Sequence, residues 1–342
     1  MIVIPSLSDS SSDLAEATKR AYRWRADRLL RRWHQEFGSQ NQSPFDFVLW
    51  LLNQRHGLKS ATFRQYKSAV LHCLPQLFPE NEDLYRAMEH LRSAQAMSNR
   101  HLPLRTSARK MRFLLEEDWE RLSDWLLRRS LSDGVIDSAR TPSISFAAIE
   151  AWCRATLLCA LRPTEWAKAE WREEGERFFV IVRNAKATQG RSHGETRTLV
   201  FDRLDRIDRE AISATIELAR AWAAKEKSAV LQKLVADTLY RAARAALGRR
   251  EAYPSLYTFR HQAIANWKTK RSALEVAAMC GHARTKTAAR HYAARRHGWR
   301  GGRLKVARAS PLDILAVRLR NPPSLTSNDV AVPENSAPKS GR

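Results

Sequence analysis

The sequence has few cysteines and no long apolar segment. Its four cysteines are scattered through 342 residues and form no Cys-x-x-Cys pair. This distribution is typical of buried thiols in a reducing compartment, not of a disulfide framework or a zinc site. The longest apolar run, FVLWLL at 47–52, is much shorter than the roughly 20 residues that a helix needs to cross a bilayer. The N-terminal MIVIPSLSDSSSD lacks a basic start and an apolar core, so we expect no signal peptide.

Several catalytic motifs are also absent. The sequence has no Gly-x-x-x-x-Gly-Lys-Ser/Thr loop for nucleotide phosphates and no His-Glu-x-x-His metal motif. It has no compact Asp and Glu cluster of the kind that holds two metal ions, although carboxylates distant in the sequence could still meet in the fold. We therefore expect chemistry without ATP, metal or another cofactor.

Acidic residues are far fewer than basic ones. The chain has 59 Lys and Arg against 36 Asp and Glu, a net charge of +23. This excess favours a polyanionic partner, of which nucleic acid is the commonest, with an anionic membrane surface as the alternative. Residues 257–309 alone contain 13 Lys or Arg and one acid, Glu275. Repulsion within this segment is destabilising unless a polyanion binds nearby.

The length allows two domains, and the composition changes along the chain divide it further. We expect the following parts: a disordered N-terminus over 1–13, a helical domain over 14–98, a basic linker over 99–111, a second domain over 112–309, a short amphipathic helix over 310–319 and a disordered tail over 320–342.

The first domain begins with a helical pattern whose apolar face runs from Tyr22 to Phe37. Seven basic residues and one acid lie between Lys19 and Arg32. These side chains form either an ordinary solvated face or a face laid along DNA phosphates, and we favour the second. A later helix, with Ser60 as its expected N-cap, adds Arg64 and Lys67 as expected DNA contacts.

The second domain changes its periodicity near 177–201. A β-branched and aromatic run, a polar Gly-containing turn and a second apolar run predict a β-hairpin there. The flanking segments, including a stretch over about 206–248 that ends at Gly248, have helical spacing. The predicted fold class is mainly α with a small β-sheet.

Three positions in this domain suggest phosphate chemistry. Arg162 follows a buried apolar stretch that breaks at Pro163, with Glu165 close behind; the two form either a structural pair or a guanidinium held rigid toward a cleft. Arg260 begins a predicted helix, where it is either a surface arginine or part of an oxyanion receptor. Tyr292 lies among many basic residues, where a phenol either anchors a helix or attacks a phosphate.

Five short motifs in order resemble those of the tyrosine site-specific recombinases, or phage integrases. They are ALRPTEW, NAKATQG, YTFR followed by His, CGH and TAARHY. Each is weak alone, but their order and spacing are specific, with 22 residues from Arg260 to His282 and 10 from His282 to Tyr292. The resemblance implies these roles: catalytic arginines Arg162 and Arg260, the acidic companion Glu165, the catalytic lysine Lys186 on a β-turn, the histidine His282 and the nucleophile Tyr292.

The same resemblance implies an architecture and a set of partners. We expect a helical SAM-like core-binding domain joined to a recombinase catalytic domain, closed on double-stranded DNA as a C-shaped clamp. The protein would form dimers to tetramers on DNA, with accessory bending or directionality proteins, in the cytoplasm at the nucleoid. The helix over 310–319 either docks on a neighbouring protomer or packs back on its own domain.

One departure from the family pattern concerns proton transfer. Tyr257 replaces the histidine of the second-arginine box. A phenol donates a hydrogen bond to phosphate but cannot shuttle protons near neutral pH. We therefore expect proton transfer to depend more on Lys186 and His282. Cys280, in place of leucine, can pack in the same way.

Other basic residues near these motifs are expected to contact DNA or to be structural. The expected DNA contacts are Arg191, Arg197, Arg284, Lys286 and Arg290. His261 is interpreted as structural, and His291 as a surface or DNA-backbone contact. Two alternatives to a recombinase remain: a DNA-binding protein that has lost catalysis, for which Tyr257 leaves room, and a type IB topoisomerase that uses the same chemistry on one strand.

Overall fold

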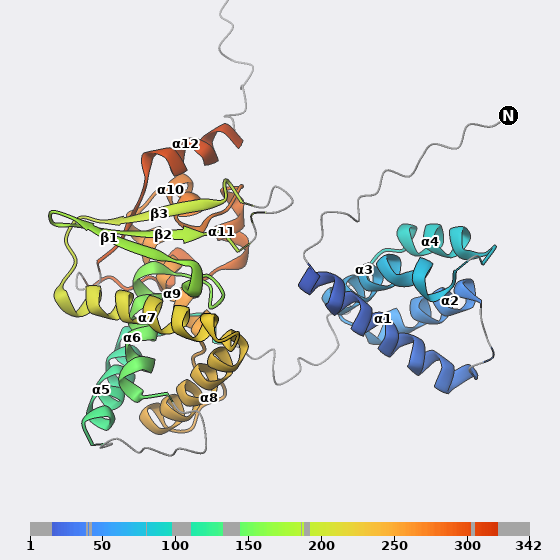
Figure 1. Ribbon diagram of the computed structural model, residues 1–342, viewed down its shortest axis with the longest axis horizontal. Coiled ribbons are helices and arrows are strands. Elements are labelled where there is room, and N and C mark those ends of the chain that lie inside the picture. The colour runs from blue at the N-terminus through green and yellow to red at the C-terminus, as the bar shows by residue number, and fades with distance from the viewer. Residues whose placement is uncertain are drawn as a thin grey trace, which may run out of the picture. The chain divides into compact units, whose positions relative to one another are not determined.

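The computed structural model shows two compact units, Met1–Ala108 and Arg109–Arg342 (Figure 1). The residues that it describes are 16–38, 40, 43–79, 81–97, 111–132, 144–185, 187, 192–301 and 305–320. The segment expected to be disordered over 1–13 lies outside the described residues, as does nearly all of the expected linker. The tail expected to be disordered over 320–342 also lies outside them, except for Arg320, which is the last residue of a helix. No described helix is both long and apolar enough to cross a membrane.

The described part of the first unit is helical (Figure 1). Its elements are α1 (Glu16–Phe37), α2 (Pro44–Gln54), a 3-10 turn (Arg55–Gly57), α3 (Ser60–Leu77) and α4 (Leu84–Ser93). Rings from α1, α2 and the end of α3 form the centre of the core, where Phe47 packs against Trp33 at 5.4 Å and Phe78 at 6.0 Å between ring centroids. This apolar centre holds the helices together, because burial of aromatic side chains dominates core energetics.

Local sequence signals explain where these helices begin. The Ser43 hydroxyl accepts a hydrogen bond from the Asp46 amide at 3.1 Å, and Pro44 is the first helical residue, as expected for the start of α2. The predicted N-cap of α3 is wrong by one residue, since Lys59 occupies that position. Ser60 instead donates its hydroxyl to the carbonyl of Met97.

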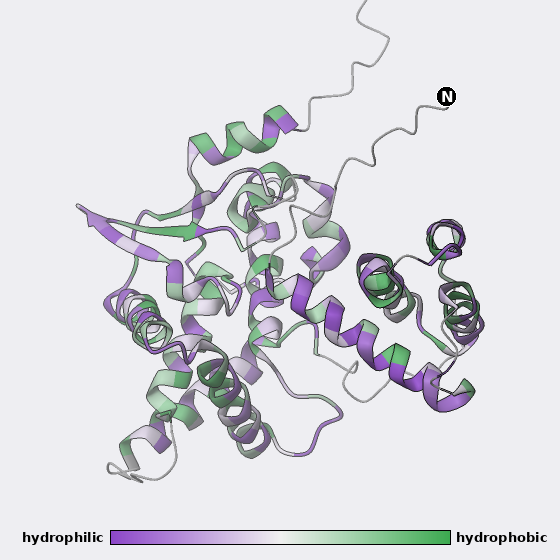
Figure 2. Cartoon of the chain, turned by 45° about the vertical axis from the view of Figure 1, so that its right-hand side comes forward, coloured by the Kyte–Doolittle hydropathy of each residue, from purple (hydrophilic) through white to green (hydrophobic). Residues whose placement is uncertain are grey.

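Helix α1 has the amphipathic pattern that its sequence predicts, with Ala26, Leu29 and Trp33 buried. Its predicted apolar face extends one turn too far, because Phe37 lies in the last turn and is exposed. Figure 2 shows α1 as largely hydrophilic apart from this face. Five of its arginines are exposed: Arg20, Arg23, Arg28, Arg31 and Arg32.

The second unit combines helices with one small sheet. Its elements are α5 (Glu116–Ser132), α6 (Phe146–Cys159), a 3-10 turn (Trp166–Lys168), β1 (Glu170–Glu174), β2 (Arg177–Arg183), β3 (Thr196–Phe201), α7 (Arg206–Ala224), α8 (Ser228–Leu247), α9 (Leu256–Lys270), α10 (Ala273–Cys280), α11 (Lys286–His291), a 3-10 turn (Arg295–His297), β4 (Arg308–Ala309) and α12 (Pro311–Arg320). The predicted fold class, mainly α with a small sheet, is confirmed.

The sheet is antiparallel, with strand order β1-β2-β3-β4. The predicted hairpin is confirmed as β2 and β3, in which Val180 is opposite Leu199. The strand β1 was not expected, because EWREE has no apolar alternation and every residue in it is exposed. It forms because its backbone pairs with that of β2. The pattern of side chains in the sequence does not predict this pairing.

Three helix features predicted from the sequence can be compared with the observed helices. The stretch expected to be helical over about 206–248 consists of two helices, α7 and α8, which are separated near Glu226, whose φ of 55° is left-handed. Helix α6 ends at Cys159, before the expected break at Pro163, because Ala160 takes a left-handed φ of 48°. The expected stop at Gly248 is the C-cap of α8. All four cysteines are free and buried, as expected.

In this single chain, α12 packs on its own unit. Asp313 accepts a hydrogen bond from the Thr198 amide of β3 at 2.7 Å, and Val317 is buried. The side chains of Leu312, Leu315 and Leu319 remain exposed. Packing back on its own domain is thus the arrangement seen here, and docking on a neighbouring protomer stays a prediction.

Candidate active site

The site is built around one buried carboxylate, that of Glu165. After the left-handed turn at Ala160, Arg162 donates to Glu165 twice: from Nη1 to Oε1 at 2.6 Å and from its amide to Oε2 at 2.9 Å. This is the pair that the sequence predicts. The pair fixes the guanidinium of Arg162 because the carboxylate holds both its side chain and its backbone.

Two more arginines share the same carboxylate. Arg197 Nη2 lies 2.8 Å from Glu165 Oε2, and Arg260 Nη1 lies 3.9 Å from it. Burial by itself raises the pKa of Glu165, but Arg197, Arg260 and Arg162 together hold it well below its ordinary value. Glu165 is therefore ionised at neutral pH, and it holds three guanidinium groups together without neutralising all of them.

The burial of Arg197 contradicts the role that the sequence predicted for it. It was expected to contact a DNA phosphate, but it is 1% exposed within β3 and also donates to the Asn184 side chain. A side chain buried in this way cannot reach DNA. The alternation of TRTLVF was the signal that could have shown this, because it places Arg197 on the same strand face as Leu199 and Phe201.

Arg260 lies in the first turns of α9. Ser255 is the N-cap of this helix and forms a capping box with Thr258. Arg260 is 0% exposed, which makes the surface-arginine interpretation wrong. It donates to the Ala160 carbonyl through Nη1 and to the Tyr292 hydroxyl through Nε at 3.3 Å and Nη2 at 3.1 Å. Burial works against its charge, yet Tyr292 and Glu165 raise its pKa above the ordinary value.

His282 enters the site from the end of α10. Gly281 caps that helix with a φ of 71°, and a Cβ at this position would overlap the Asn184 side chain. The turn brings the His282 ring onto Tyr292, with 5.6 Å between the ring centroids. Burial, and then the positive charges of Arg260, Arg162 and Arg197, lower the pKa of His282 to about 2. Its imidazole is therefore neutral at pH 7 and offers one N–H donor.

Tyr292 directly follows α11 and is held in place from α9. Lys268 Nζ donates to the Ala288 carbonyl at 2.9 Å and to the Ala293 carbonyl at 2.7 Å, on either side of the tyrosine. The Tyr292 ring contacts the His261 ring at 5.0 Å between centroids, and the Arg260 guanidinium carbon lies 5.1 Å from its centre. Tyr292 is half-buried, and its oxygen lies on the Arg260 guanidinium.

The structure thus brings together four of the sequence-predicted catalytic residues with their acidic companion. They are Arg162, Arg260, His282, Tyr292 and Glu165. Tyr257 is on the first turn of α9 and is 49% exposed. Lys186 and Arg191 lie outside the described residues.

The side chains expected to contact DNA differ in their exposure and in the hydrogen bonds that they already make. Arg284, Lys286 and Arg290, around α11, are exposed, as is Arg64 on α3. Lys67 already donates to the carbonyls of Arg92 and Ala94, at 2.7 Å each, so its ammonium holds the C-terminal end of α4. Sequence reasoning missed Lys268, for which no local pattern gives a signal.

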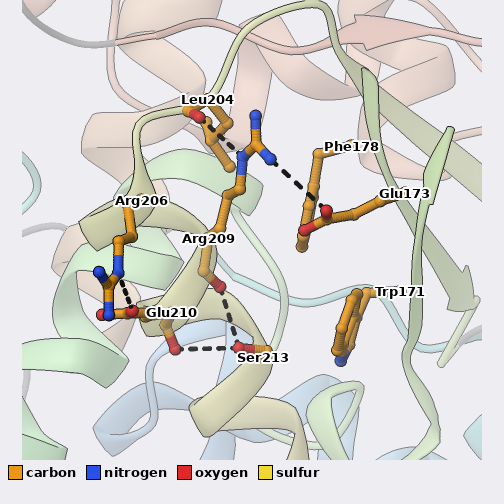
Figure 3. Close-up of a pocket in the computed structure, with 8 residues that line it drawn as sticks. All are labelled: Trp171, Glu173, Phe178, Leu204, Arg206, Arg209, Glu210 and Ser213. Carbon is orange, nitrogen blue, oxygen red and sulfur yellow. Dashed lines mark hydrogen bonds and ion pairs between the residues drawn. The ribbon is translucent and has the colours of Figure 1, made fainter. Parts of the chain in front are cut away.

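A separate hollow of about 590 Å³ lies between the sheet and α7 (Figure 3). Its floor contains Trp171, stacked on Phe178 with 5.6 Å between the ring centroids. The arginines at its edge are already paired, Arg206 with Glu210 and Arg209 with Glu173 (Figure 3). The hollow shares no residue with the cluster of Arg162, Arg197 and Arg260, and its paired arginines have little free positive charge to attract a phosphate.

Among the described residues, no three His, Cys, Asp or Glu side chains are grouped to hold a metal ion.

Comparison with solved structures identifies the fold. A crystal structure of a lambda integrase (75–356) dimer bound to a COC′ core site aligns with a TM-score of 0.51 and 13% identity, covering 86% of this chain and 95% of that one. A crystal structure of XerA recombinase is also found, at 13% identity and a TM-score of 0.32, covering 81% of this chain and 86% of that one. No family model and no curated protein matches. The fold expected from the motif resemblance is therefore confirmed: this chain has the fold of the tyrosine recombinases.

Proposed function

We propose that this protein cleaves and rejoins DNA strands through a covalent bond between Tyr292 and a 3′-phosphate. The observation that carries the proposal is the placement of the Tyr292 hydroxyl on the Arg260 guanidinium, beside the neutral ring of His282. Arg162 is anchored to the same carboxylate as Arg260. A nucleophile, two fixed cations and a neutral donor are the groups that attack on a phosphodiester needs.

The arginines have a defined role in this reaction. A DNA phosphodiester is already negative, and its transition state spreads more charge over the phosphate oxygens. Fixed guanidinium groups stabilise that charge without reorganisation, because their forked donors match phosphate geometry. Arg162 and Arg260 supply this charge, and Glu165 with Arg197 position them. His282 donates its one N–H to the phosphate.

The covalent step exchanges one phosphorus–oxygen bond for another. The Tyr292 oxygen loses its proton and attacks phosphorus, and the bond to the 5′ oxygen breaks with its electron pair. The leaving 5′ oxygen needs a proton, for which a lysine amid other cations is a suitable acid; the family resemblance assigns this role to Lys186. The phosphotyrosine retains the bond energy, so rejoining to another 5′-hydroxyl requires no ATP.

The proposed partner is double-stranded DNA. The exposed arginines of α1, together with Arg284, Lys286 and Arg290, supply positive charge for the phosphate backbone. Strand exchange needs two DNA sites, so we propose dimers that pair into tetramers on DNA. Such a protein would act in the cytoplasm on nucleoid DNA, with accessory DNA-bending proteins, in the integration or excision of a mobile element.

The test uses a nicked suicide substrate made from the DNA that flanks the protein's own gene. The wild type should become attached to the DNA as a complex that survives denaturing electrophoresis, and Tyr292→Phe should not. Tyr240→Phe, at an exposed tyrosine of α8, is the matched control and should attach like the wild type. Adduct formation by Tyr292→Phe would contradict the proposal.

A second candidate function is favoured by one observation, the exposed Tyr257 in place of the usual histidine. In this alternative the protein binds DNA but has lost cleavage. It predicts tight, salt-dependent binding of the same DNA with no covalent complex from the wild type. The suicide substrate therefore separates the two candidates directly.

A further inference from the structure

We propose that His261 accepts the phenolic proton of Tyr292 when a strand is cleaved. This inference rests on the proposed function, because it assigns a residue to a step of that reaction. A tyrosine has an ordinary pKa of about 10, so its proton must be removed for attack near neutral pH. Tyr257, at the position where the family resemblance leads one to expect a histidine, is itself a phenol and cannot serve as the acceptor.

The contact between the two rings is part of a fixed arrangement. His261 follows Arg260 on α9, and its ring meets the Tyr292 ring at 5.0 Å between centroids and an interplanar angle of 48°. Lys268, two turns further along the same helix, holds the carbonyls on both sides of Tyr292. Helix α9 therefore contacts the tyrosine segment through both His261 and Lys268, and these contacts keep the imidazole and the phenol together before DNA binds.

The hydrogen bonds of the two side chains are complementary. The Tyr292 oxygen accepts from Arg260 Nε and Nη2, and no acceptor for its own O–H is found among the described residues. Among the described residues, no hydrogen-bond partner is found for the buried Nδ1 of His261 or for that of His282. Tyr292 therefore has an unused donor, and each of the two imidazoles beside it has an unused nitrogen. Catalytic hydrogen bonds are often long in a free enzyme and shorten only when substrate binds.

His282 also touches Tyr292, at 5.6 Å between ring centroids, and it is the rival acceptor. Its surroundings argue for a different role. It is buried beside Arg260, Arg162 and Arg197, so an added proton would place a further positive charge inside the arginine cluster. We therefore assign His282 to the phosphate, as a donor.

His261 is better placed to carry a proton briefly. It is half-buried, so the proton can pass on to water. The charged groups that face it are Arg260 and Lys268 on α9 and Arg112, with Tyr292 as its neighbour. Burial, and then these cations, lower the pKa of His261 to about 4. The ring is neutral at pH 7, and it is a stronger base than His282, whose pKa is about 2.

The proposed step balances without any further reactant. The phenolic O–H bond breaks toward the His261 nitrogen, and the oxygen's electron pair forms the bond to phosphorus. The bond from phosphorus to the 5′ oxygen breaks, and that oxygen takes a proton from the separate acid. On rejoining, the incoming 5′-hydroxyl gives its proton to the acid that lost one, and the departing phenolate regains a proton through His261, directly or from water, so the enzyme ends as it began.

The test measures the single-turnover rate of adduct formation from pH 5 to pH 10 for the wild type, His261→Gln and His261→Ala. At pH 7 both variants should be slower by about 10² to 10⁴ fold, the usual range for a lost acid–base group. The gap should close toward pH 10, where tyrosine ionises by itself. Added imidazole should restore part of the rate of His261→Ala.

The controls separate this inference from the proposed function. His90→Gln, at an exposed histidine of the first unit, should retain the wild-type rate at every pH. If the wild type forms no adduct, the proposed function fails. If the wild type forms the adduct but the His261 variants match it, or are slowed equally at every pH, only the assignment of His261 is overturned.

Discussion

Arg260 donates two hydrogen bonds to the hydroxyl of Tyr292, from Nε at 3.3 Å and from Nη2 at 3.1 Å. The two residues are 32 positions apart, on α9 and directly after α11. A single chain therefore holds the proposed nucleophile against its own proposed phosphate receptor. The tyrosine segment is fixed there by Lys268, which binds the carbonyls of Ala288 and Ala293.

This arrangement predicts that Tyr292 acts in the chain that carries it. Tyr292→Phe should form no adduct, because it lacks the attacking oxygen, and Arg260→Lys should lose adduct formation by about 10² to 10³ fold, because it lacks the forked donor to the phosphate. A mixture of the two variants should remain inactive on the suicide substrate, because no chain has a complete site. Restored attachment in the mixture would show that tyrosines are exchanged between protomers.

Removal of the central carboxylate should destabilise the second unit. Glu165→Gln leaves Arg162, Arg197 and Arg260 buried without their counter-charge, and breaking a buried ion pair in this way costs about 3–5 kcal/mol. Urea unfolding provides the measurement. The matched control is Glu210→Gln, which removes an exposed partner of Arg206 and should change stability little, because exposed ion pairs are screened by water. Equal losses from both variants would contradict the central role of Glu165.

The turn before His282 should not tolerate a side chain. Gly281→Ala places a Cβ 2.8 Å from Asn184 Cγ at a φ of 71°, and the left-handed conformation alone costs about 1–2 kcal/mol. We expect a lower unfolding midpoint together with a slower cleavage rate. The rate should fall because Asn184 binds Arg197, and Arg197 shares the Glu165 carboxylate with the two proposed catalytic arginines. Gly57→Ala, where nothing lies within 4 Å, is the comparison and should leave both unchanged. Wild-type stability of Gly281→Ala would exclude this account of the turn.

Stability should decrease as the pH falls from about 6.5 toward 4. The pKa of His282 is lowered to about 2 and that of His261 to about 4 in the folded chain, from an ordinary 6.5. The unfolded chain therefore takes up protons first, so the stability is complete above pH 6.5 and is lost below it. Thermal unfolding at pH 8, 6.5 and 5 measures the effect. His282→Asn should flatten the dependence, and an equally steep decline in that variant would assign it to other groups.

Arg197 and Arg290 should respond in opposite ways. Arg197→Met removes a buried partner of Glu165 and should lower the unfolding midpoint. Arg290→Gln changes an exposed side chain and should leave stability unchanged, while it weakens DNA binding and reduces the salt dependence of the affinity by about one charge. The measurements are urea unfolding and DNA titrations at several salt concentrations. Loss of DNA affinity by a stably folded Arg197→Met would restore the original expectation for that residue.

Much of this site could be predicted because short motifs record it. The Arg162–Glu165 pair and the hairpin of β2 and β3 each follow from local spacing or alternation. What could not be predicted depends on contacts between distant segments. The strand β1 has no alternation of its own and forms by backbone pairing. The contact of His261 with Tyr292 exists only because α9 and the segment after α11 pack together.

The central claim is that the Tyr292 oxygen becomes bonded to DNA phosphorus. Its most direct test is to digest the trapped complex with nuclease and trypsin and to find the nucleotide by mass spectrometry. Tryptic cleavage separates Tyr292, in the peptide of residues 291–295, from Tyr253 and Tyr257, in the peptide of residues 251–260. The account predicts a nucleotide mass on Tyr292 in the first peptide. A nucleotide on the second peptide, or on no tyrosine at all, would contradict it.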